Sequence, residues 1–143
     1  MDLPSPRPGL VIRFSFLWRH ERDAGADEAA KDRPCAIVLA ARRTEQGDTQ
    51  VVVAPITHRP PIEPESAIEI PPPICRRLGL DAGRHWLRLE ELNRFAWPGY
   101  DLRPIPGRDG AVAYGMLPPA LFEQLRRGIL ARQAARRIRI QPR

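Results

Sequence analysis

The sequence predicts a mainly β domain, in which a small, strongly bent antiparallel sheet or barrel carries an α-helix near its C-terminus. Five or six short segments have the apolar pattern of β-strands and are separated by turn residues. One segment near the C-terminus has helical periodicity. Proline accounts for 17 of the 143 residues, which disfavours a helical bundle because proline breaks helix interiors. Several strands followed by one helix is an order typical of small barrels.

The N-terminal half contains the three most regular predicted strands. Apolar residues alternate with others over 10–18, which predicts a half-buried strand, and the polar residues 19–33 predict a long loop. The continuously apolar segment 35–41 predicts a central strand. A turn at 45–48 then leads into its antiparallel partner over 51–57.

The second half predicts shorter elements. Six prolines occur within 58–75, where only residues 67–70 are expected to form a short edge strand. Residues 84–92 alternate, with Trp86, Arg88 and Glu90 on one face and Leu87 and Leu89 on the other.

The last predicted strand passes through Val112 and Tyr114, after a turn at 107–110. The helix is expected to begin near Pro118 or Pro119, because proline suits a first helical turn. Its apolar stripe consists of Leu121, Phe122, Leu125 and Ile129.

The length is that of one domain. No apolar run is long enough to cross a membrane, and the first eight residues lack the apolar region of a signal peptide, so we expect a cytoplasmic protein. The two cysteines, Cys35 and Cys75, are expected to be free thiols. The sequence has neither a CxxC motif nor histidines clustered along the chain, so it predicts no metal site and no cofactor.

The positive charge is concentrated at the C-terminus. The formal net charge is +6, and the last 18 residues, from Arg126 onward, contain seven arginines and no acidic residue. Such a block can attract nucleic acid or an acidic partner. The alternative is a solvated helix face followed by a frayed tail.

Two pairs of polar residues are candidates for phosphate chemistry. If strands 35–41 and 51–57 pair through the turn, Arg33 lies beside Thr57, and a guanidinium beside a hydroxyl suits a phosphate. Arg88 and Glu90 leave the same face of a strand, where they could act as charge stabiliser and proton acceptor. The alternatives are an arginine that fixes a strand end and a solvated ion pair.

The remaining candidates are histidines and aromatic residues. His20 and His58 flank the same region in this strand pairing, and either could serve as an acid or base. Both could equally be ordinary surface histidines. Trp18, Trp86 and Trp97 could stack on bases, although each has the apolar neighbours expected of core packing.

Several segments, taken together, resemble the PemK/MazF family of bacterial toxins. The resemblance covers about residues 9–130 and rests on the order and spacing of short motifs. The motifs are Gly9-Leu10-Val11, Lys31-Asp32-Arg33-Pro34, Val52-Val53-Ala54-Pro55-Ile56-Thr57, Leu87-Arg88-Leu89-Glu90, Glu90-Glu91-Leu92-Asn93-Arg94, Trp97-Pro98-Gly99 and Tyr114-Gly115-Met116-Leu117-Pro118. The last three are similar to a proteobacterial branch of the family.

The resemblance implies an SH3-like barrel of the CcdB/MazF type that forms a homodimer. It also implies a toxin of a type II toxin-antitoxin system that cuts single-stranded RNA at specific sequences without metal. The implied partner is an antitoxin whose acidic tail lies across the active groove. The expected organisation is a flexible arm (1–8), one barrel domain (9–131) and a basic C-terminal tail (132–143).

The resemblance also implies site residues. Arg33 and Thr57 match positions that the family uses at its active site, and Arg88 and Glu90 match a further arginine and acid used by some members. Those members have a histidine in the loop before Arg-Pro, whereas residues 25–30 here contain none. His20, Glu21 or Glu90 are the candidates to replace it, and His58 is a further candidate for acid–base or substrate-binding work.

These residues suit RNA cleavage by the RNA's own 2′-hydroxyl. Our hypothesis is that Glu90 acts as base, Arg33 and Arg88 stabilise the developing charge, and Thr57 positions the phosphate. Two other classes of function stay open. One is a non-catalytic barrel that binds nucleic acid or protein, and the other is a toxin of the same fold that poisons gyrase.

Overall fold

The computed structural model describes residues 3–25, 31–43, 45 and 47–143. In chain order its elements are β1 (Leu10–Phe14), α1 (Arg19–Asp23), β2 (Arg33–Arg42), β3 (Thr49–Thr57), the 3-10 turn η1 (Pro64–Ser66), β4 (Ala67–Glu69), α2 (Pro72–Leu78), β5 (Trp86–Arg88), β6 (Glu91–Trp97), β7 (Ala113–Met116), α3 (Pro119–Ala134) and β8 (Arg139–Pro142). The predicted mainly β fold with a C-terminal helix is confirmed.

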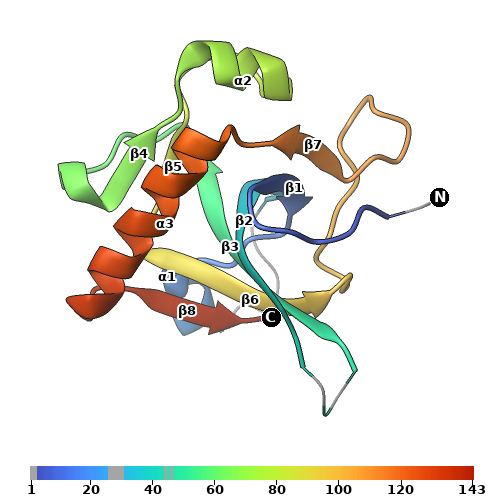
Figure 1. The fold of residues 1–143 in the computed structure, drawn as a ribbon, viewed down its shortest axis with the longest axis horizontal. Helices are drawn as coiled ribbons and strands as arrows, with labels where there is room; N and C mark the ends of the chain where they lie inside the picture. The colour runs from blue at the N-terminus through green and yellow to red at the C-terminus, as the bar shows by residue number, and fades with distance from the viewer. Residues whose placement is uncertain (1–2, 26–30, 44, 46) are drawn as a thin grey trace.

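The strands form one open sheet. Their order is β4-β5-β3-β2-β1-β7, and β6 pairs with β3 while β8 pairs with β6. The β6–β8 pairing is parallel and the other pairings are antiparallel. Figure 1 shows α3 beside the sheet and β8 returning along β6. The pairings among the described strands do not close into a ring, so the antiparallel sheet is shown, whereas an SH3-like barrel stays a prediction.

Apolar side chains on opposite faces of β2 and β3 form two cores. Ala36, Ala54 and Ile56 pack with Leu87 and with Leu125 of α3. On the other face, the buried side chains pack with the aromatic residues of β1 and β6. This second core contains Leu10, Ile12, Phe14, Phe16, Cys35, Ile37, Val51, Val53 and Phe95. The central strands are therefore covered on both sides, which explains why 35–41 and 51–57 are almost continuously apolar.

Two helices lie in segments for which the sequence predicted none. α1 lies within the predicted loop 19–33, and its five residues are too few to give a periodic signal. α2 lies in the proline-rich segment. Its prolines stand at the first helical positions, where no N–H is needed, and Gly79 ends it with a left-handed φ of 70°.

Two strands also correct the prediction. The segment 84–92 is not one strand, because β5 ends at Arg88 and the chain turns into β6. The basic segment 132–143 is not a frayed tail over its last residues, since β8 pairs with β6 and Gln141 is buried. The Arg139 amide donates to the Glu90 carbonyl at 2.9 Å, and the Arg143 amide donates to the Arg94 carbonyl at 2.8 Å.

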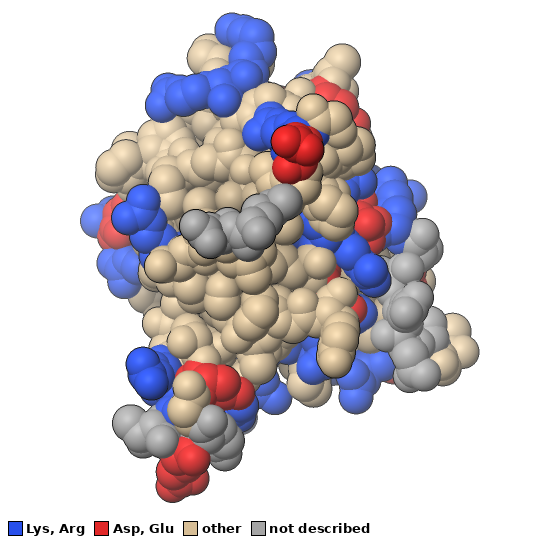
Figure 2. Space-filling view, turned by 90° about the vertical axis from the view of Figure 1, so that its right-hand side faces the viewer, with Lys and Arg blue, Asp and Glu red and all other residues tan. Residues whose placement is uncertain are grey.

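Cys35 and Cys75 are free thiols, as predicted, and both are buried. Lys and Arg side chains gather around the rim of the face seen in Figure 2, and the described residues between them carry few charges. In the part of the chain that the structure describes, each helix is too short or too polar to cross a membrane.

The packing of α3 on the sheet gives a stability prediction. Leu125→Ala should lower the free energy of unfolding by about 2–5 kcal/mol, because Leu125 is fully buried and its loss leaves a cavity. Leu130→Ala, on the exposed part of the same helix, should cost well under about 1 kcal/mol. Urea unfolding measures both, and equal losses would contradict the described packing of α3.

Candidate active site

Four of the sequence-predicted residues lie on one face of the sheet. The β2–β3 register pairs Cys35 with Pro55, and continuing it by two residues sets Arg33 opposite Thr57. The β3–β5 register pairs Thr57 with Trp86. Because directly paired residues point to the same side and side chains alternate along a strand, Arg33, Thr57, Trp86 and Arg88 share a face. Sheet spacing puts the Cα atoms of Thr57 and Arg88 about 8 Å apart.

Glu90 joins this group through Arg88. Arg88 Nε donates to Glu90 Oε1 at 2.6 Å, and both side chains are only about one-fifth exposed (17% and 21%). The second carboxylate oxygen of Glu90 is buried and has no hydrogen-bond partner among the described residues. The predicted pair is therefore formed, and it leaves an acceptor unsatisfied.

Arg33 is held at the start of β2 by an aromatic ring. Its guanidinium carbon lies 5.2 Å from the centre of the Trp18 ring. Burial lowers the pKa of Arg33, while Cys35 and Glu21 act in the opposite direction. Its Nε is buried with no hydrogen-bond partner among the described residues. Arg33 as a whole is half-buried, and a half-buried cation is suited to receive an anionic group.

The segment that carries Trp18 and Glu21 is fixed by β6. Asn93 is fully buried, and its side chain accepts from the Leu17 amide at 2.8 Å and donates to the Leu17 carbonyl at 2.9 Å. The Arg19 amide donates to Glu91 Oε1 at 2.6 Å. Because the Trp18 amide also donates to Glu21 Oε1, at 3.0 Å, α1 stands in a fixed position beside Arg33.

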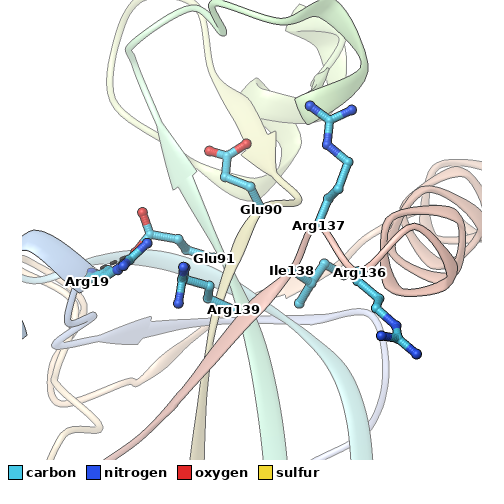
Figure 3. Close-up of a pocket in the computed structure, with 7 residues that line it drawn as sticks. All are labelled: Arg19, Glu90, Glu91, Arg136, Arg137, Ile138 and Arg139. Carbon is cyan, nitrogen blue, oxygen red and sulfur yellow. Dashed lines mark hydrogen bonds between the residues drawn. The ribbon is translucent and has the colours of Figure 1, made fainter.

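A polar pocket of about 510 Å³ continues the site beyond Glu90. Figure 3 shows Glu90 and Glu91 from the turn into β6, Arg19 from α1, and side chains from the segment between α3 and β8. The lining residues are Arg19, Glu90, Glu91, Arg136, Arg137, Ile138 and Arg139. Four arginines line the pocket with two glutamates, while Arg137 also pairs with Glu63 and Arg19 with Asp23. The arginines at the pocket suit a polyanion that can compete with these ion pairs.

The remaining sequence-predicted candidates are the histidines His20 and His58. His20 is exposed on α1, next to Glu21. His58 follows Thr57 but belongs to the opposite face, where its ring contacts Asp81 and lies 4.3 Å from the ring of His85. The absence of a histidine from loop 25–30 concerns a segment of which residues 26–30 lie outside the described residues.

Sequence reasoning missed Asp81 and His85, which the structure brings together with His58. Partial desolvation acts to raise the pKa of Asp81, but hydrogen bonds from His85 and His58 outweigh it and hold that pKa below its usual value. The signal in the sequence was a histidine four residues after an aspartate, which is weak without the β3–β5 register. Cys35 is fully buried, and burial raises the pKa of its thiol, which disfavours the thiolate that a nucleophile requires.

No protein-family model and no curated protein matches this chain.

The anchoring of α1 gives a second prediction. Asn93→Leu should lower the free energy of unfolding by about 2 kcal/mol, because it leaves the buried Leu17 amide without a partner. Arg94→Leu changes the exposed neighbour on the same strand and should cost much less. Denaturant unfolding compares the two, and an equal cost would mean that Asn93 does not anchor the Trp18 segment.

Proposed function

We propose that this protein is an endoribonuclease that cleaves single-stranded RNA without metal, and that it acts as a PemK/MazF-like toxin of a type II toxin-antitoxin system. The observation that carries the proposal is the shared face of Arg33, Thr57 and Arg88, with Glu90 bonded to Arg88. Two cations, a hydroxyl and a carboxylate are the groups that RNA cleavage by its own 2′-hydroxyl requires.

The reaction transfers one proton at each end of the scissile phosphate. The carboxylate of Glu90, whose side chain is 21% exposed, accepts the proton of the 2′-hydroxyl, whose oxygen then attacks phosphorus. The bond from phosphorus to the 5′-oxygen breaks, and that oxygen takes up a proton. The products are a 2′,3′-cyclic phosphate and a free 5′-hydroxyl.

Arg33 and Arg88 stabilise the charge that develops on the phosphate. The Thr57 hydroxyl donates to the Arg59 carbonyl at 3.3 Å in the free protein, and in this proposal it turns to donate to the phosphate instead. The acid for the 5′-oxygen comes from α1 in this proposal. Glu21 interacts electrostatically with Arg33, and His20 is its neighbour on the helix. We give His58 no part in the reaction, because it belongs to the opposite face of the sheet.

The proposal also includes a fold type, an oligomeric state, binding partners and a place of action. The open antiparallel sheet with its C-terminal helix supports an SH3-like architecture of the CcdB/MazF type, and the few charges on the described residues inside the rim of the face in Figure 2 support a homodimer. The arginines around the pocket support binding of RNA and of an acidic antitoxin tail. The proposed place of action is the cytoplasm, where mRNA is the substrate.

Cleavage of a long single-stranded RNA in EDTA tests this function. The wild-type protein should give discrete fragments that end in 2′,3′-cyclic phosphate. Arg88→Ala and Arg33→Ala should each lower the rate by about a hundredfold or more, because each removes a cation that faces the phosphate. Arg43→Ala, at the opposite end of β2, should cleave at the wild-type rate, since Arg43 pairs with Asp48 in the hairpin.

Three results would contradict the proposal. Equal cleavage by wild type and Arg88→Ala would remove Arg88 from the site or reveal a contaminating nuclease. Binding of RNA without cleavage, by folded protein free of antitoxin, would favour the non-catalytic binding module. Inhibition of DNA supercoiling by gyrase in place of RNA cleavage would favour the gyrase-poisoning toxin.

The polar pocket beyond Glu90 gives a separate prediction. Replacing Arg137 and Arg139 by glutamine should weaken RNA binding and reduce the slope of log affinity against log salt by about 0.7 for each lost phosphate contact. These substitutions retain the backbone of strand β8, whereas a truncation of the C-terminus would remove that strand. The matched control replaces Arg76 and Arg77, two exposed arginines of α2. An equal loss in both double variants would mean that the pocket has no specific role.

A further inference from the structure

A second cluster of side chains lies on the face opposite to the proposed active site. The β3–β5 register pairs Thr57 with Trp86, and continuing it by one residue sets His58 opposite His85. Because side chains alternate, the two imidazoles share the face of Ile56 and Leu87 rather than that of Thr57. Asp81, from the turn after α2, completes the cluster.

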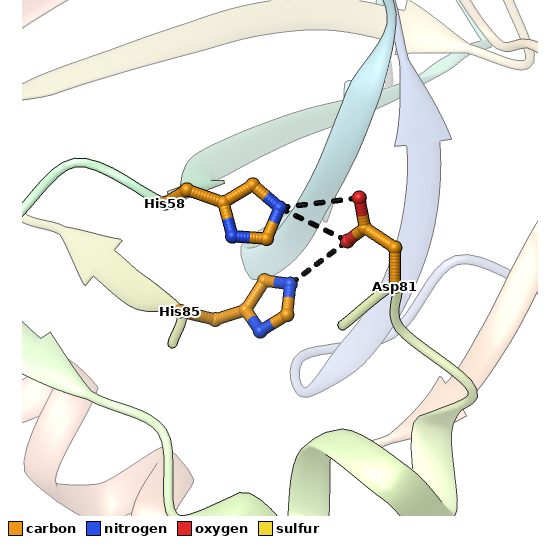
Figure 4. Close-up of side chains that lie close together, drawn as sticks. All are labelled: His58, Asp81 and His85. Atoms are coloured by element: carbon orange, nitrogen blue, oxygen red, sulfur yellow. Dashed lines mark hydrogen bonds and ion pairs between the residues drawn. The ribbon is translucent and has the colours of Figure 1, made fainter. Parts of the chain in front are cut away.

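The three side chains converge on a small volume (Figure 4). His58 Nε2 lies 3.1 Å from each carboxylate oxygen of Asp81, and His85 Nε2 lies 3.0 Å from Oδ1 of the same carboxylate. All three ligand atoms lie within 4.8 Å of one another. Bonds of 2.0–2.1 Å in a tetrahedral zinc site set neighbouring ligand atoms about 3.3 Å apart. The cluster is therefore close to the size that one such ion needs.

The hydrogen bonds of His58 leave a place for a cation. Its Nδ1 lies 2.9 Å from the carbonyl oxygen of Arg84, and its Nε2 faces the Asp81 carboxylate. A neutral imidazole has only one N–H, so it cannot donate to both acceptors. In one tautomer Nε2–H donates to Asp81. In the tautomer whose Nδ1–H donates to the carbonyl, the lone pair of Nε2 and an oxygen of Asp81 face each other. A metal ion between them satisfies both, and a backbone carbonyl that orients the ring in this way is typical of metal-binding histidines.

Burial also fits such a site. His85 is 2% exposed, so its ring is fixed by packing, whereas His58 and Asp81 are exposed. The exposed side gives an ion access and leaves a position for a water molecule as fourth ligand. Two imidazoles and one carboxylate favour a borderline ion such as Zn²⁺ over Mg²⁺ or Ca²⁺, which prefer oxygen ligands.

We propose that His58, Asp81 and His85 bind one Zn²⁺ ion. The ion ties the end of β3 to the turn that precedes β5. It thereby holds Thr57 and Trp86, the residues next to its two histidines, in register on the other face. This site takes no part in the RNA chemistry proposed above, and its existence does not depend on that function.

Zinc titration of tag-free protein, stripped with chelator and dialysed, tests the site. Isothermal calorimetry should show one Zn²⁺ per chain, and Co²⁺ at the same site should give the visible absorption of a tetrahedral nitrogen–oxygen site. His58→Ala and Asp81→Ala should each lower zinc affinity by at least about tenfold, because each removes a ligand. Both residues are exposed, so both variants are expected to fold, which circular dichroism checks.

His20→Ala is the matched control, because His20 is the one histidine of the chain outside the cluster. It should bind zinc as the wild type does, and Mg²⁺ should not compete. Wild-type affinity in His58→Ala or Asp81→Ala would overturn the proposal, and so would folded wild-type protein that binds no zinc. In the latter case the contact between His58 and Asp81 is an ordinary hydrogen bond between side chains. The titration contains no RNA, so its outcome is independent of any cleavage result.

Discussion

The register of β3 against its neighbours is the constraint on which the rest of the structure depends. β3 pairs with β2, β5 and β6, and it sends alternate side chains into the two cores. A shift of one residue would exchange the faces of Thr57 and His58. The burial of Val53 on one side and Ile56 on the other prevents that shift, because both side chains would lose their core. Apolar packing in the middle of β3 therefore positions the polar residues at its end.

Both proposed sites share one end of the β3–β5 ladder. Thr57 faces Arg33 on one side of the sheet, and His58 faces His85 on the other. Since Thr57 and His58 are consecutive, an ion that fixed His58 would also restrict the backbone that carries Thr57. The sheet thus separates the proposed anion-binding face from the proposed metal-binding cluster by the thickness of one strand.

The sequence predicted the parts of this arrangement that depend on local pattern. The continuous apolar runs of β2 and β3 and the apolar stripe of α3 identified those elements, and the spacing of Arg88 and Glu90 indicated their pairing. The sequence did not predict α2 because its prolines would break the interior of a helix. At the first turn, where they stand here, prolines are instead favourable. β8 has four residues, and its place beside β6 comes from partners about fifty residues away. Asp81 and His85 carry no motif, so only the long-range register shows that they meet His58.

The most direct test of the account is the structure of the protein with a short RNA whose scissile 2′-hydroxyl is replaced by hydrogen, which prevents cleavage. The scissile phosphate should contact Arg33 and Thr57, Arg88 should lie beside it, and the 2′-position should face Glu90. The flanking phosphates should extend toward Arg137 and Arg139. An RNA bound on the His58 face, or one held by the polar pocket with no phosphate near Arg33, would contradict the assignment of this face as the active site.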